Sequence, residues 1–142
     1  MGRPFHASLH TLPSGAIAEE PVDLQGRPIR QLMLSATRLA DPLPVSFEEA
    51  FERLSALPRM FIEPDGSFVW VSDSTEFTWQ LDGLLFDRGG QLQYVELHGA
   101  CTPQAFQRFA DIFRNGQTRF AIQLMQQAIF LSEDEFRRLV FE

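Results

Sequence analysis

The sequence contains a single cysteine, no lysine and no long hydrophobic run. With Cys101 as the only thiol, no disulfide can form within the chain, which is typical of proteins in a reducing compartment. No apolar run approaches the roughly 20 residues of a membrane span, and the N-terminus lacks the charged start and apolar stretch of a secretory signal. These absences predict a cytoplasmic protein that does not enter a membrane.

The common signatures of cofactor and metal binding are also missing. Gly89-Gly90 is not followed by the Lys-Ser/Thr pair of a phosphate-binding loop. Neither a zinc-finger spacing nor a G-x-S-x-G nucleophile motif occurs. The sequence therefore predicts no cofactor and no metal, and it argues against an enzyme without excluding one.

Two histidines, His6 and His10, are four residues apart, a spacing that binds metal when the segment is helical. Pro4 and Pro13 bracket the pair, and no cysteine or acidic residue stands nearby. Because a metal needs about four ligands, we expect this pair to lie in a flexible tail instead of a metal site.

Negative charge is concentrated in the middle of the chain. Residues 31–101 hold eleven acidic residues and four arginines, which accounts for the whole net charge of −7. In each flanking segment the acidic residues and the arginines are equal in number. An acidic middle repels phosphate backbones, so the sequence predicts that nucleic acid is not a partner.

The length and the aromatic content indicate one globular domain. The chain has 142 residues, a hydrophobic fraction of 44% and fourteen phenylalanines, enough for a substantial core. Prolines and glycines interrupt residues 1–28 so often that we expect an irregular N-terminal segment there. The sequence leaves open whether part of this segment pairs as an edge strand or stays mobile. Residues 29–142 are then expected to form a single α+β domain.

Three helix starts can be recognised by their capping residues. Ser46 and Glu49 match the S-x-x-E capping box, in which each side chain binds the other's backbone N–H. Thr102 precedes Pro103, the residue that suits the first helical position. Ser132 begins a third, short helix.

Alternation of apolar and polar residues predicts the strands between these helices. The pattern leaves open whether 119–125 and 128–131 are separate strands. The expected strands cover residues 31–37, 60–62, 69–72, 77–86 and 91–98, with turns at 63–67 and 87–90.

A faint internal repeat adds to this pattern. Residues 50–54 (AFERL) reappear in kind as residues 105–109 (AFQRF), and two apolar runs follow each copy. We therefore expect an α+β fold: an antiparallel sheet with helices on one face, built from two pseudo-repeated strand-helix-hairpin units.

Repeated units of this kind resemble ferredoxin-like and TATA-binding-protein-like sheets. From Ser46 onward the order helix, strands, helix, strands, helix, together with the acidic charge, also resembles type III secretion chaperones. This second resemblance covers about two-thirds of the chain and implies a small, acidic, dimeric protein that binds other proteins.

Cys101 is the sharpest candidate for chemistry. It lies just before a helix N-terminus, where the helix dipole lowers the pKa of a thiol, and His98 could serve as its base. The competing interpretation places Cys101 opposite Phe106 in a hydrophobic staple. We favour packing, because a buried cysteine usually behaves as a small hydrophobe.

The central hairpin supplies the remaining candidates. Asp82 precedes a glycine on the first strand and points away from its apolar neighbours, so we expect it in solvent. Leu84 and Phe86 add an apolar end to that otherwise polar face, which suggests a contact patch. The sequence does not decide which face of the second strand carries Tyr94.

The leading functional hypothesis is a non-enzymatic protein-interaction domain, chaperone-like or regulatory, that binds another protein or forms a homodimer. Its contact surface would include Leu84 and Phe86. The alternative is a small-molecule-binding protein or enzyme with an aromatic pocket, whose polar groups would be Asp82, Tyr94, His98 and Cys101.

Overall fold

The computed structural model describes residues 1–39 and 41–142. Within these residues, nine strands form one antiparallel sheet in the order β2-β3-β9-β8-β1-β7-β6-β5-β4. No helix in the described ranges is long and apolar enough to cross a membrane. The strands are β1 (Phe5–Thr11), β2 (Glu19–Leu24), β3 (Arg27–Leu32), β4 (Met60–Ile62), β5 (Ser67–Val71), β6 (Gln80–Arg88), β7 (Gln91–Ala100), β8 (Phe120–Leu124) and β9 (Ile129–Ser132).

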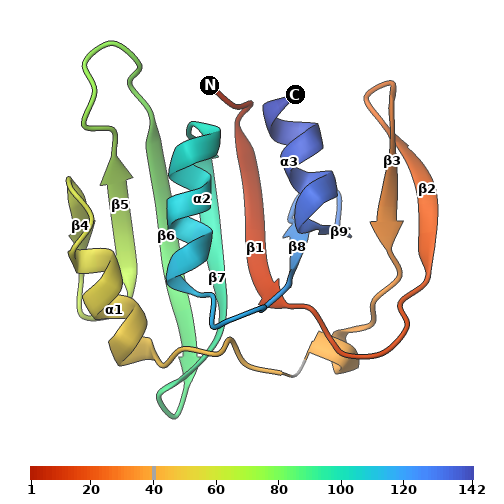
Figure 1. Cartoon of the computed structure of the whole chain (residues 1–142), viewed down its shortest axis with the longest axis horizontal. Coiled ribbons are helices and arrows are strands. Elements are labelled where there is room, and N and C mark those ends of the chain that lie inside the picture. Colours follow the sequence, from red (N-terminus) through yellow and green to blue (C-terminus); the bar gives the residue numbers. More distant parts are fainter. Residues whose placement is uncertain (40) are drawn as a thin grey trace.

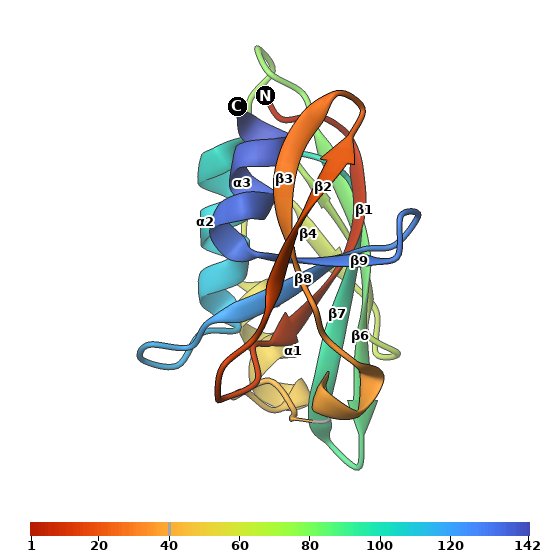
Figure 2. The same cartoon turned by 90° about the vertical axis from the view of Figure 1, so that its right-hand side faces the viewer.

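The α-helices are α1 (Phe47–Ser55), α2 (Pro103–Ile112) and α3 (Glu133–Phe141), and a 3-10 turn, η1, spans Ala36–Leu39. All three α-helices lie on the same side of the sheet (Figures 1 and 2). The expected α+β class with helices on one face is therefore confirmed, in a molecule that is mostly sheet. We call the side of the sheet away from the helices the open face.

The predicted helix starts are confirmed by the hydrogen bonds at their caps. The Ser46 hydroxyl accepts from the Glu49 N–H, and the Glu49 carboxylate accepts from the Ser46 N–H, which completes the capping box. Thr102 accepts from Ala105 N–H, with proline at the first position of α2. Each of these bonds joins residues three positions apart, so the helix starts depend on local sequence.

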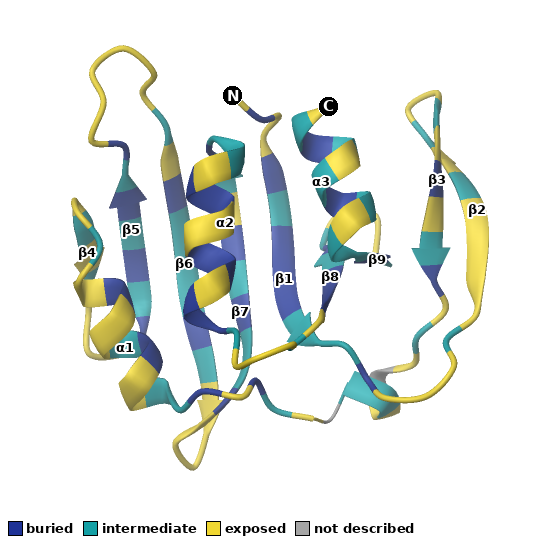
Figure 3. Cartoon of the chain, in the orientation of Figure 1, coloured by how far each residue is buried: buried dark blue, intermediate teal, exposed yellow. Residues whose placement is uncertain are grey.

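The expectation that residues 1–28 are irregular is wrong. Strand β1 lies at the centre of the sheet, hydrogen-bonded to β7 on one side and to β8 on the other. Phe5, Ala7 and Leu9 belong to the buried core, and because side chains alternate along a strand the residues between them face the open side. Most of β1 is buried or half-buried (Figure 3). The flanking prolines and glycines lie in the loops around the strand, so they do not interrupt it. Strand β2 then pairs with β3 at the edge of the sheet.

Two strand predictions also need correction, and one open question is answered. The strand expected at 31–37 is β3, which ends at Leu32. The alternative left open for 119–125 and 128–131 is decided in favour of two separate strands, β8 and β9. The strand expected from Phe77 begins only at Gln80. The Ser74 hydroxyl accepts hydrogen bonds from the backbone N–H groups of Glu76 and Phe77, so a local turn replaces strand pairing there.

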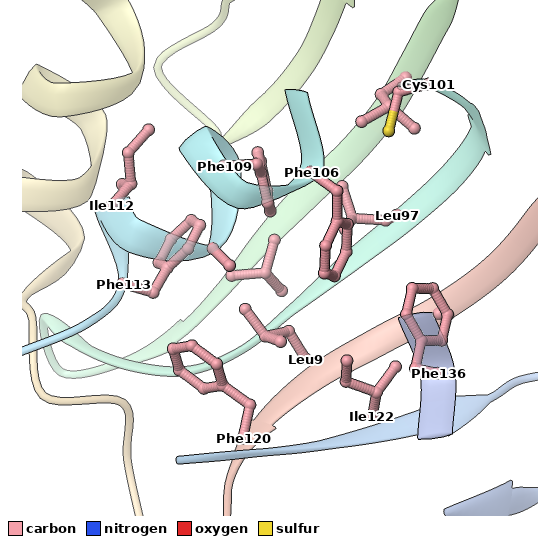
Figure 4. Packing of buried hydrophobic residues seen from close by; sticks show 14 of the residues in the cluster. Leu9, Leu97, Cys101, Phe106, Phe109, Ile112, Phe113, Phe120, Ile122 and Phe136 are labelled. Atoms are coloured by element: carbon pink, nitrogen blue, oxygen red, sulfur yellow. The ribbon is translucent and has the colours of Figure 1, made fainter. Parts of the chain in front are cut away.

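The core lies between the sheet and α2 (Figure 4). Phe106 and Phe109 of this helix and Phe113, which caps its C-terminus, are at most 1% exposed. Phe109 packs on Phe113, and the rings also contact aromatic residues of neighbouring elements. Helix α1 precedes the β4–β5 hairpin and α2 precedes the β8–β9 hairpin. The two sets have different neighbours in the sheet, and the pseudo-repeat is not confirmed.

Candidate functional site

The three histidines of the chain, far apart in sequence, come together on the open face. His6 and His10 lie on β1, and His98 lies opposite His6 on β7. The rings of His6 and His98 are 5.1 Å apart. Because successive side chains of a strand alternate between faces, residues 6, 8 and 10 all project away from the helices.

A row of aromatic rings crosses this face next to the histidines. Phe86 of β6 stacks on Tyr94 of β7 at a centroid distance of 4.5 Å, and Tyr94 stacks on His10 at 5.1 Å. His10 in turn meets the edge of Phe130 from β9 at 6.0 Å. We call Phe86, Tyr94, His10 and Phe130 the aromatic row. It gives the open face an apolar centre that spans β6, β7, β1, β8 and β9.

Polar contacts border the aromatic row. The His6 Nε2 atom lies 2.7 Å from a carboxylate oxygen of Glu96, with both side chains 31% exposed. Asp82 pairs with His98 across the β6–β7 ladder and accepts a hydrogen bond from Gln80. Carboxylates and imidazoles therefore stand side by side next to apolar rings.

His10 is the titratable group most affected by this arrangement. Burial lowers the pKa of its imidazole from 6.5 to about 4. Its Nε2 is within 2.7 Å of the Ser8 hydroxyl, which is itself buried. The ring is therefore neutral near pH 7, where it acts as a member of an apolar stack instead of a charge.

The structure brings five of the six predicted site residues together. In the β6–β7 register, Asp82 opposes His98 and Phe86 opposes Tyr94, while Leu84 lies between them on β6. All five project to the open face. Sequence reasoning missed His6, His10 and Phe130. The alternation of residues 5–10 was the available signal for the two histidines. The expected second hairpin offered β9 as a neighbour of β8, but nothing in the sequence placed β8 beside β1.

The sixth predicted residue, Cys101, lies on the opposite side of the sheet. Its side chain is fully buried at the start of α2 (Figure 4), and burial raises the pKa of the thiol to about 12. His98 is exposed on the open face. The sheet therefore separates the imidazole from the thiol, and the two do not form a nucleophile–base pair.

This burial predicts very slow labelling of Cys101 in the native protein. A thiol whose pKa rises from about 9 to about 12 loses about a thousandfold of its thiolate near neutral pH, and only the thiolate reacts. We expect an aromatic disulfide reagent to modify Cys101 only after denaturation. A Gln117→Cys variant, which adds a thiol on an exposed loop, should be modified at once at that second site. Rapid modification of native wild-type protein would contradict the prediction.

Two clefts contain no residue of the aromatic row. One, of about 560 Å³, is formed by β1, the β2–β3 turn, the β8–β9 turn and the end of α3. The other, of about 250 Å³, is lined by Trp70, Phe77 and Trp79 near the start of α2. This smaller cleft is aromatic, but Asp82, Tyr94, His98 and Cys101 do not line it.

Comparisons with known protein families, with characterised proteins and with solved structures found no match. Across residues 1–39 and 41–142, no three His, Cys, Asp or Glu side chains are grouped in a way that could hold a metal ion. Fold and site together describe a two-layer α+β protein with helices on one layer and an aromatic, histidine-bearing sheet face on the other.

Proposed function

We propose that this chain is a non-enzymatic protein-interaction domain that pairs with a second copy of itself through the open face of its sheet. The observation that supports this most strongly is the aromatic row. Phe86, Tyr94, His10 and Phe130 are only partly buried, although they form a continuous apolar band over the centre of the sheet. Such a band is stabilised when a partner covers it.

The size of the open face suits a homodimer. Strands spaced about 4.8 Å apart make the seven strands from β9 to β4 about 33 Å wide. With a usable strand length of about 20 Å, the face covers about 650 Å². A standard stable interface buries about 800 Å² on each partner, so two open faces in contact approach that area.

Charge on the open face supports a second copy over an unrelated partner. Asp82 and Glu96 supply carboxylates, and His6 and His98 supply imidazoles on the same surface. A two-fold axis places the same patch on both subunits, so a face that holds both acceptors and hydrogen-bonding imidazoles can match itself. A chaperone-like or regulatory role would use such a dimer to present its edges and helices to other proteins.

The test is the oligomeric state of two matched variants. Sedimentation equilibrium of the wild type should give a dimer at micromolar concentration. Leu84→Asp combined with Phe86→Asp puts four carboxylates into a two-fold interface and should raise the dimer dissociation constant more than about 100-fold. Phe77→Asp removes an equally large ring that is 59% exposed on the β5–β6 loop, and it should leave the dimer intact.

Circular dichroism would establish that all variants are folded. A wild type that stays monomeric at about 100 μM, a concentration at which a specific dimer is well populated, would contradict the proposal. An unchanged dimer in the Leu84→Asp/Phe86→Asp variant would also contradict it, because the interface would then lie elsewhere.

A further inference from the structure

The larger cleft, of about 560 Å³, contains no residue of the aromatic row, although His6 of the open face is one of its lining residues. It lies where the β2–β3 hairpin diverges from the rest of the sheet, because β3 pairs with β9 only at Leu32 and Phe130. In Figure 1 this hairpin lies at the side of the molecule, next to α3, to which Arg27 is hydrogen-bonded. The volume falls within the roughly 300–1,000 Å³ that is usual for small-molecule sites.

Two arginine side chains meet in this cleft. Nη1 of Arg3 and Nη1 of Arg27 donate to the same oxygen, the Leu139 carbonyl, at 2.8 and 2.7 Å. Arg27 also donates to the Arg138 carbonyl at 3.0 Å. The negative end of the α3 dipole partly offsets the repulsion between the two cations. Among the ion pairs formed by residues 1–39 and 41–142, none involves Arg3 or Arg27.

The carbonyl contacts leave hydrogen-bonding capacity at both guanidiniums. A guanidinium has five N–H donors, and the described contacts use one donor of Arg3 and two of Arg27. Both arginines line the cleft. Two adjacent cations whose remaining donors border a cleft match the geometry with which a carboxylate is bound.

The rest of the lining is partly apolar. Phe5, Leu24 and Leu139 contribute hydrocarbon surface beside the arginines. Gln126 and Gln127, on the turn between β8 and β9, supply amides at the rim. An inorganic anion would leave the hydrocarbon surface uncovered, and a purely apolar ligand would leave the guanidiniums without a counter-charge.

We infer that this cleft binds a small monocarboxylate with an apolar body of about six to ten carbons, a size that suits the volume of the cleft. The carboxylate contacts Arg3 and Arg27, and the hydrocarbon body lies against Leu24 and Leu139. This places a ligand site at the C-terminal end of α3, bordered by β1 and by the β2–β3 and β8–β9 turns.

Isothermal titration calorimetry with octanoate, acetate and octanol tests both halves of the site. Octanoate should bind at least about tenfold more tightly than acetate, which lacks the body, and than octanol, which lacks the charge. Arg27→Gln should weaken octanoate binding about tenfold or more. Arg30→Gln is the matched control: it removes the same charge from the same strand, outside the cleft, and should leave the affinity unchanged.

A second variant keeps the test independent of the structural role of Arg27. Gln127→Glu adds a carboxylate to the rim on an exposed turn, without altering an arginine, and should weaken octanoate binding about tenfold by repulsion. The inference is overturned if octanoate does not bind at about 10 mM, or if it binds no better than octanol. It is also overturned if folded Gln127→Glu binds octanoate as tightly as the wild type. None of these outcomes bears on the dimer, which the Leu84 and Phe86 variants test separately.

Discussion

Replacing Leu9 by alanine is expected to lower the free energy of unfolding by about 3 kcal/mol and the melting temperature by about 10 °C. Leu9 is 2% exposed in the central strand, where Val95 and Ile122 flank it on the neighbouring strands. Removing its isobutyl group leaves a void that strands on both sides prevent from closing. Chemical denaturation followed by tryptophan fluorescence gives the change directly.

The matched control is Leu12→Ala, three residues further along. Leu12 lies beyond the end of β1 and is only partly buried, so the same deletion should cost less than about 1.5 kcal/mol. The contrast between the two variants separates a central strand from an irregular N-terminal segment. Equal, small effects would mean that residues 5–11 are not part of the core.

Acidification is expected to destabilise the protein through His10. In the folded state burial holds the pKa of His10 at about 4, against 6.5 for a free imidazole. Between these values the unfolded chain binds a proton that the folded chain does not, so stability falls as the pH drops from 6.5 to about 4. As the pH rises above 6.5 the imidazole becomes neutral in both states, so the loss of stability disappears. At 1.36 kcal/mol per pH unit, discounted for partial exposure, the loss is on the order of 2 kcal/mol.

The effect is measured as the difference between wild type and His10→Gln in urea denaturation at several pH values. The carboxylates are common to both proteins, so the difference isolates the imidazole. The wild type should lose about 2 kcal/mol more than the variant between neutral and acidic pH. His98→Gln, which removes an exposed imidazole from the same face, should retain the wild-type dependence. Parallel curves for wild type and His10→Gln would contradict the burial of His10.

His10 also connects stability with the proposed interface. The ring stacks on Tyr94 and lies against Phe130, and Ser8 holds its Nε2. Toward the start of β1 the same face carries Ser8 and then His6, whose imidazole contacts Glu96 of β7. Protonation of His10 would place a charge inside the aromatic row, so the dimer we propose should weaken at the same acidic pH that destabilises the fold.

The positions of the helices could be read from the sequence because their signals are local. Ser46, Thr102 and Ser132 cap helices through hydrogen bonds to residues three positions later, and the structure has each of these bonds. Similarly, the turn at 63–67 follows from proline and glycine chemistry within five residues. The apolar stripe of α2 needed only the helical period to be recognised.

Strand positions were less predictable, since a strand is stabilised by partners far along the chain. Residues 5–11 alternate as a strand should, but the surrounding prolines and glycines concealed the pattern. What makes this segment the centre of the sheet is its pairing with β7 and β8, residues about ninety and about one hundred and fifteen positions away. Phe77 lies in a segment that alternates like a strand but does not form one. Hydrogen bonds to the Ser74 hydroxyl hold a local turn there instead.

The features of the candidate surfaces also fall into those that the sequence determines and those that depend on tertiary structure. The sequence alone determined an α+β chain with capped helices, a negatively charged middle, one unpaired thiol, and a central hairpin that carries Leu84 and Phe86 on one face. Only the tertiary structure decided that β1 brings His6 and His10 beside Tyr94, that Cys101 lies on the other side of the sheet, and that Arg3 and Arg27 meet at one carbonyl oxygen. The physical reason is distance along the chain: caps and turns form between near neighbours, whereas a sheet face and a cleft are assembled from strands whose order no local signal specifies.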